Sequence, residues 1–185
     1  MSGKKIGGAG LRGQSAGETS ICTVGVSGSS LTYRGYDIVD LAENTTFEEV
    51  AYLLLHEKLP NSHELKDYIE KLKSLRGLQP EIRNALEGIP KTSHPMDVLR
   101  TGCSVLGNLE QEEGFLNQTD HADRMLSAFP SILNYWYQFS HHGKRIDTET
   151  NDNTIGGHFL HLLHGKKPSR LHKQVMSVSL ILYAE

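Results

Sequence analysis

The sequence predicts a mainly α-helical fold with one small β-hairpin near the N-terminus. Apolar residues recur at helical spacing from about residue 46 onward, and helix-start and helix-stop residues bracket each periodic segment. A short β-prone stretch precedes them. With 185 residues, 37% of them hydrophobic, the chain is long enough to bury one sizeable core.

The first 17 residues predict a mobile arm, because they are rich in Gly and Ser and show no periodicity. Residues 18–185 then form one domain. Its first element is a hairpin of residues 20–26 and 31–33, joined by the turn-forming segment 27–30. We expect no further strand of comparable strength.

Seven helices follow, and each has a recognisable start. Thr46 and Glu49 form a capping-box pair, and Gly77, Gly88 and Gly165 are helix-stop residues. We expect a kink at Pro130, because proline removes a backbone hydrogen bond inside the longest helix. The helices begin at Thr46, Ser62, Pro80, Pro95, Thr119 (after a polar connection over residues 107–118), Asp152 or Thr154, and Ser169.

The last helix becomes more apolar toward Glu185 and has no stop residue. A helix that is apolar almost all round belongs deep in a core. We therefore expect that the chain is truncated within a larger domain.

Composition excludes several classes of protein. The net charge of −3 supplies no basic field for nucleic acid, and no apolar stretch is long enough to span a membrane. Cys22 and Cys103 form no metal or disulfide pattern, and no secretory signal follows Lys4 and Lys5. These features predict a soluble cytoplasmic protein.

Several motifs favour structural roles over chemistry. Residues 8–13 match GxGxxG but lack the flanking strand and helix of a dinucleotide site. His158, His161 and His164 alternate with Phe and Leu, which is typical of hydrogen-bonded core histidines; a substrate-site role and metal binding stay open as alternatives. Tyr135-Trp136-Tyr137 predicts a core or subunit-interface segment.

Two strings of residues resemble the N-terminal part of the citrate synthase family. The first comprises residues 31–42 (LTYRGYDIVDLA), 47–54 (FEEVAYLL) and Leu59-Pro60; the second is residues 93–101 (SHPMDVLRT). Residues 135–137, 155–165 and 182–185 are similar, more narrowly, to the bacterial 2-methylcitrate synthases. The motifs follow one another in order from about residue 18 to the end.

This resemblance implies a large helical domain of citrate-synthase type, incomplete in this chain, a smaller domain that closes over the substrates, and a homodimer. It also implies an acyltransferase that condenses propionyl-CoA with oxaloacetate and water, giving 2-methylcitrate and CoA without a metal or redox cofactor. In the family an aspartate removes the proton next to the thioester, one histidine stabilises the enol and another polarises oxaloacetate.

The same resemblance places those three catalytic residues beyond Glu185, so the 185-residue chain alone is predicted to be inactive. Within the chain, the resemblance suggests a contact with the thioester substrate at Lys73 or at Arg76. A solvated surface lysine is the competing interpretation.

Three alternatives remain open. The first is a citrate synthase that uses acetyl-CoA. The second is a non-catalytic helical dimerisation fragment, suggested by the aromatic helix and the apolar end. The third is a metal-binding module built on the three histidines of residues 158–164.

Overall fold

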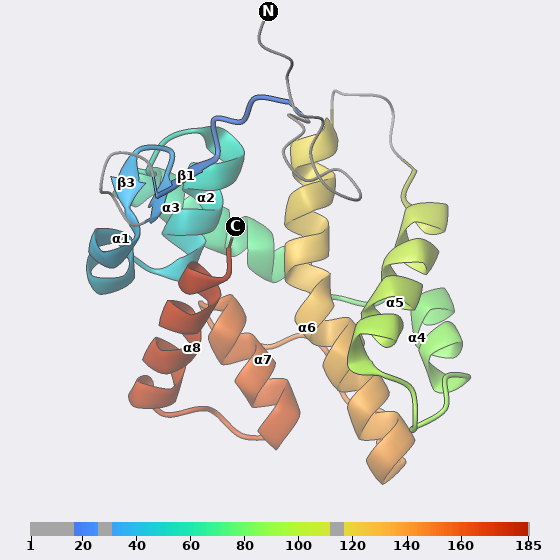
Figure 1. Cartoon of the computed structure of the whole chain (residues 1–185). Coiled ribbons are helices and arrows are strands. Elements are labelled where there is room, and N and C mark those ends of the chain that lie inside the picture. The colour runs from blue at the N-terminus through green and yellow to red at the C-terminus, as the bar shows by residue number, and fades with distance from the viewer. Residues whose placement is uncertain (1–16, 26–30, 112–116, 185) are drawn as a thin grey trace, which may run out of the picture.

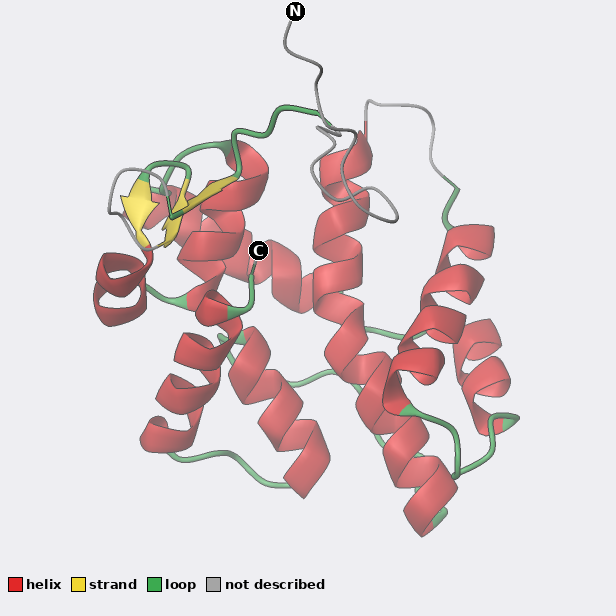
Figure 2. Cartoon of the chain, in the orientation of Figure 1, coloured by secondary structure: helices red, strands yellow, loops and turns green. Residues whose placement is uncertain are grey.

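A computed structural model describes residues 17–25, 31–111 and 117–184 of the chain. Within these residues the structure has eight α-helices and one three-stranded antiparallel sheet (Figures 1 and 2). The mainly α-helical prediction is therefore confirmed. The predicted arm, the GxGxxG match and the hairpin turn at residues 27–30 lie outside the described residues, apart from Gly17.

The sheet contains β1 (Cys22–Val24), β2 (Leu31–Tyr33) and β3 (Tyr36–Asp37) in that order. The predicted hairpin is the β1–β2 pair. The sheet has one short strand beyond the predicted hairpin, because the two-residue β3 is added by a turn of Arg34 and Gly35. Both have positive φ, 48° and 88°, as a hairpin turn of this length requires. The Arg34 guanidinium stabilises the turn by donating to Ser20, Glu57 and the Leu54 carbonyl.

The helices of the N-terminal half are capped by side chains that the sequence largely identifies. The Thr46–Glu49 capping box is present, and a second box begins at Asn61, one residue before the predicted start. A seven-residue helix capped by Asp37 was missed, since two turns carry too little periodicity to detect. These helices are α1 (Ile38–Asn44), α2 (Phe47–His56) and α3 (Ser62–Ser74).

The remaining helices begin where the sequence predicts, within a residue or two. One correction concerns residues 107–109, which were expected in a polar connection but complete α5; Glu110 is its C-cap. Pro80 and Pro95 occupy first-turn positions, and Pro130 lies inside α6. The helices are α4 (Pro80–Glu87), α5 (Pro95–Leu109), α6 (Gln118–His142), α7 (Ile155–His164) and α8 (Arg170–Leu182).

The expectation that the last helix lies deep in a core holds on one side only. Ile181 is fully buried, and the Tyr33 hydroxyl donates to its carbonyl. Leu171, Val175 and Leu182 share another side of α8 and are 66%, 61% and 50% exposed. Among the described residues, nothing covers that apolar side.

Two apolar clusters form the core, one on each side of the molecule. The first joins the sheet, α1, α2 and α3 to Ile155 and Ile181, and the second joins α4 and α5 to α6. Figure 1 shows α6 running through the middle, with α4 and α5 on one side and α7 and α8 on the other. The boundary between the two clusters is where the buried polar side chains collect.

Candidate functional site

A stripe of buried polar residues runs along one side of α6. Asp123, Ser127, Ser131 and Gln138 lie four or seven residues apart and are at most 8% exposed. Asp123 accepts from the Tyr68 hydroxyl at 2.7 Å, and Gln138 donates to the last carbonyls of α7. This stripe was not predicted from the sequence, although its spacing of four along the helix was the available signal.

His158 is the centre of the buried polar network. It is 0% exposed; its Nδ1 lies 3.0 Å from the Thr150 hydroxyl and its Nε2 lies 3.1 Å from the Ser131 hydroxyl. Burial, and then the nearby Arg76 charge, lower the pKa of His158 to about 3. The ring is therefore neutral at pH 7, and the expectation of a hydrogen-bonded core histidine is confirmed for this residue.

The surrounding donors assign the tautomer of that ring. Arg76 donates to the Thr150 hydroxyl oxygen at 3.5 Å, which leaves the Thr150 O–H directed at Nδ1. Ser131 donates to the Thr148 carbonyl at 3.4 Å, so its oxygen accepts from Nε2–H. We assign the Nε2–H form from this pattern. Because both ring nitrogens are hydrogen-bonded, His158 holds residues 148–150 in place.

Arg76, one of the two predicted substrate contacts, is buried in the same network. It is 1% exposed, and its guanidinium donates to the Thr150 carbonyl at 2.8 Å and to the Thr154 carbonyl at 3.5 Å. Desolvation by burial lowers its pKa from the usual value. In this chain the Arg76 side chain therefore faces the protein interior and ties the end of α3 to the segment before α7.

Lys73, the other predicted contact, lies near the surface. Its side chain is 20% exposed, and Nζ lies 3.0 Å and 3.2 Å from the two carboxylate oxygens of Glu70. Lys73 and Arg76 are thus not brought together in one site. Of the two, Lys73 is the one that an external ligand can reach, and its role as a substrate contact stays a prediction.

Two side chains from distant parts of the sequence hold the start of α7. The Thr154 hydroxyl caps Gly157 N, and the Glu48 carboxylate on α2 accepts from Ile155 N at 2.7 Å. Glu48 is only 2% exposed, and burial raises the pKa of its carboxyl despite this hydrogen bond. A carboxylate at a helix N-terminus interacts favourably with the helix dipole. Glu48 was not predicted as a capping residue of α7, because its partner lies 107 residues away.

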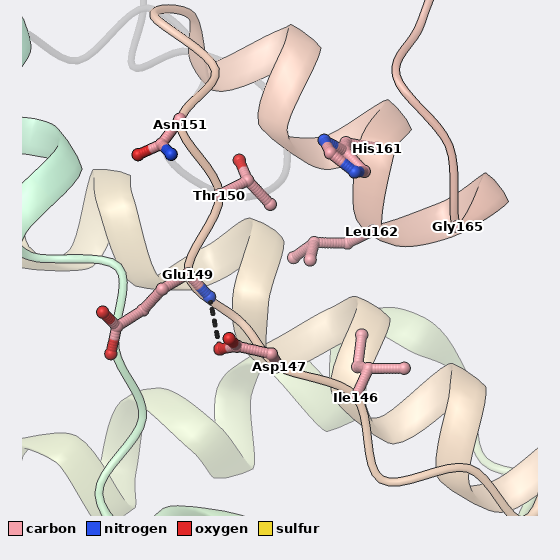
Figure 3. Close-up of a pocket in the computed structure, with 8 residues that line it drawn as sticks. All are labelled: Ile146, Asp147, Glu149, Thr150, Asn151, His161, Leu162 and Gly165. Atoms are coloured by element: carbon pink, nitrogen blue, oxygen red, sulfur yellow. Dashed lines mark hydrogen bonds between the residues drawn. The ribbon is translucent and has the colours of Figure 1, made fainter.

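A surface pocket of about 400 Å³ opens beside the network (Figure 3). Thr150 lies in its wall and links it to His158; Ile146 and Leu162 supply apolar surface. The polar groups of the wall come mainly from the α6–α7 connection, where Asp147 Oδ1 accepts from Glu149 N at 3.0 Å. The remaining lining residues are Asn151, His161 and Gly165. This volume falls within the ~300–1,000 Å³ of small-molecule sites.

The three histidines of residues 158–164 do not form a single cluster. His158 is buried in the network, His161 lines the pocket and His164 is exposed near the end of α7. Within the part of the chain that the structure describes, no group of three His, Cys, Asp or Glu side chains is placed to hold a metal ion. None of its helices is both long and apolar enough to cross a membrane.

Comparisons with known sequences show a consistent similarity. Residues 10–185 match the family model described as "Citrate synthase, C-terminal domain". A 2-methylcitrate synthase from Shewanella oneidensis is 67% identical over 98% of this chain and 48% of its own length. A citrate synthase from Heyndrickxia coagulans is 33% identical over 95% of this chain and 48% of its own length. The chain thus spans about half the length of the curated relatives it matches.

Comparisons with solved structures show the same fold. The citrate synthase of Thermotoga maritima has a TM-score of 0.81 and 32% identity, covering 96% of this chain and 46% of that one. The citrate synthase of Pyrobaculum aerophilum has a TM-score of 0.82 and 28% identity, with 95% and 46% covered. The helical arrangement around α6 is therefore shared with proteins of low sequence identity.

Proposed function

The chain belongs to the citrate synthase family, and from this membership we propose that it is the N-terminal half of a 2-methylcitrate synthase. The proposed reaction condenses propionyl-CoA with oxaloacetate and water to give 2-methylcitrate and CoA, without a metal or redox cofactor. One observation carries the choice of substrate. The 67% identity to the Shewanella oneidensis enzyme is about twice the identity to the citrate synthases of Heyndrickxia coagulans and Acidithiobacillus ferridurans, 33% and 32%.

In this proposal the described residues form a scaffold and do not carry the reacting groups. His158 is neutral and hydrogen-bonded on both nitrogens, so it has no free site for proton transfer to a substrate. Arg76 and Glu48 fix the start of α7 in a similar way. The catalytic aspartate and histidines implied by the family lie outside residues 1–185, and the complete enzyme is proposed to be a homodimer.

A chimera tests the proposed substrate. Residues 1–185 replace the corresponding half of the Shewanella oneidensis relative, and CoA release is measured with propionyl-CoA and with acetyl-CoA, each with oxaloacetate. We expect condensation with a higher kcat/KM for propionyl-CoA, as in the parent relative measured beside it. If the chimera prefers acetyl-CoA and the parent relative does not, the proposal is replaced by citrate synthase. A Bacillus subtilis relative carries both names, as "Citrate/2-methylcitrate synthase".

Two further measurements test the scaffold role of residues 1–185 and the role of Lys73. Purified residues 1–185 are expected to show no condensation, and detectable turnover would contradict the scaffold role. In the active chimera, Lys73→Ala is expected to raise the KM for propionyl-CoA with little change in kcat, whereas an unchanged KM would leave Lys73 as a surface lysine paired with Glu70.

A further inference from the structure

A second pocket, of about 210 Å³, lies between the α6–α7 connection and the beginning of α8. It shares Asn151 and His161 with the larger pocket and is otherwise lined by Asn153, Asp152, Lys167 and Lys173. Neither the predicted substrate contacts nor the proposed reaction uses this pocket. The lysine and amide side chains in its wall offer hydrogen-bond donors to a ligand.

The donors in this pocket are available to a ligand. The side chains of Asn151, Asn153 and Lys167 have no hydrogen-bond or ion-pair partner among the described residues. Lys173 lies 2.6 Å from Asp152 Oδ1 and its side chain is 26% exposed, so this pair holds the ammonium in place while leaving donors unused. Two lysines and two amides therefore face a common space.

The charge of the one carboxylate in the wall is balanced by Lys173. The Asp152 side chain is 2% exposed, and its Oδ1 accepts from both Lys173 and the Thr154 hydroxyl. The segment from His164 to Lys173 adds Lys166 and Arg170 and contains no acidic residue, in a chain of net charge −3. This local excess of positive charge attracts anions to the corner between α7 and α8 (Figure 1).

We propose that this pocket binds a small oxyanion, of the phosphate or polycarboxylate class. Its volume is below the ~300 Å³ lower bound of pockets for drug-sized ligands, which favours a small anion over a nucleotide. Lysine ammonium groups act as point charges toward phosphate or carboxylate oxygens, and amide N–H groups complete the coordination. The site does not depend on the proposed condensation reaction.

The test titrates the 185-residue chain with inorganic phosphate and with citrate at pH 7.5, with chloride at matched ionic strength as the reference. Calorimetry gives the affinity, and NMR follows the side-chain amides of Asn151 and Asn153. We expect saturable binding of at least one anion with shifts in both amides. Tighter phosphate binding would identify a phosphoryl ligand, and tighter citrate binding a polycarboxylate.

Three variants locate the site. Lys167→Glu and the isosteric Asn153→Asp each place a carboxylate in the pocket and are expected to weaken binding about tenfold or more. Lys66→Glu makes the same charge change at an exposed position on α3 outside the pocket, and screening at 0.15 M salt should keep its effect below about twofold. The proposal is overturned if neither anion saturates, or if all three variants weaken binding equally.

Discussion

Replacing His158 by glutamine should make the stability of the protein less dependent on pH between 7.5 and 5. In the folded state burial lowers the pKa of His158 to about 3, against 6.5 for a free imidazole. As the pH falls, the imidazole therefore binds a proton in the unfolded chain but stays neutral in the folded chain. The free energy of unfolding therefore has its full value above pH 6.5 and decreases progressively as the pH falls toward 3.

The magnitude follows from the same two values. A pH of 5 lies about 1.5 units below the pKa of the imidazole in the unfolded chain, and each unit corresponds to about 1.36 kcal/mol. Protonation of the unfolded chain at His158 should therefore lower the free energy of unfolding by about 2 kcal/mol at pH 5 relative to pH 7.5. Glutamine does not titrate in this range. Glu48 and the other nine histidines are present in both proteins, so their contributions largely cancel in the comparison.

Urea unfolding at pH 7.5 and pH 5 gives the change in the free energy of unfolding between the two pH values. This change is compared between the wild type and His158→Gln. Equal pH dependence in the two proteins would refute the buried, neutral imidazole. Should the variant fail to fold, an NMR titration of the wild type is decisive by itself. The His158 ring signals must then stay unchanged down to pH 5, and a midpoint near 6.5 would refute the reasoning.

Four single substitutions and one double variant test other parts of the scaffold by urea unfolding at pH 7.5. Gly157→Ala should destabilise the protein by about 2 kcal/mol or more, because the new Cβ would overlap Asp152 Oδ1. The control Gly107→Ala, which has open space around it, should instead stabilise the protein by about 0.5–1 kcal/mol. Equal effects of the two substitutions would contradict the packing around Gly157. Lys173→Met should cost about 3 kcal/mol by leaving the Asp152 carboxylate buried and unpaired, and adding Asp152→Asn should recover part of that loss. Thr46→Ala removes the cap of α2 and should cost about 1 kcal/mol, whereas no loss would show that the capping box contributes nothing.

Local rules predicted most helix boundaries from the sequence. Thr46, Pro80, Pro95 and Ser169 start helices, and Gly165 ends one, because capping and proline effects act over three or four residues. Those interactions are visible in the order of residues. The elements that were missed, α1 and β3, are too short to show a period.

The candidate site was much less predictable. His158 was correctly expected to be a hydrogen-bonded core residue, whereas His161 lines a pocket and His164 is exposed, because the three residues lie on different sides of α7. Its partners were not identified, because Ser131 lies 27 residues away and Thr150 lies in an irregular segment. Arg76 was considered for a ligand contact, and the fold directs its guanidinium to backbone carbonyls 74 and 78 residues further on.

The sequence by itself determined the mainly helical class, most helix boundaries and the family, since these depend on short-range capping, periodicity and ordered motifs. The tertiary structure alone decided that Glu48 caps α7, that a buried polar network separates the two apolar clusters, and that unpaired lysine and amide donors meet beside α8. The physical reason is that hydrogen bonds and burial depend on which surfaces come into contact. That contact is made by residues far apart in the chain, and only folding brings them together.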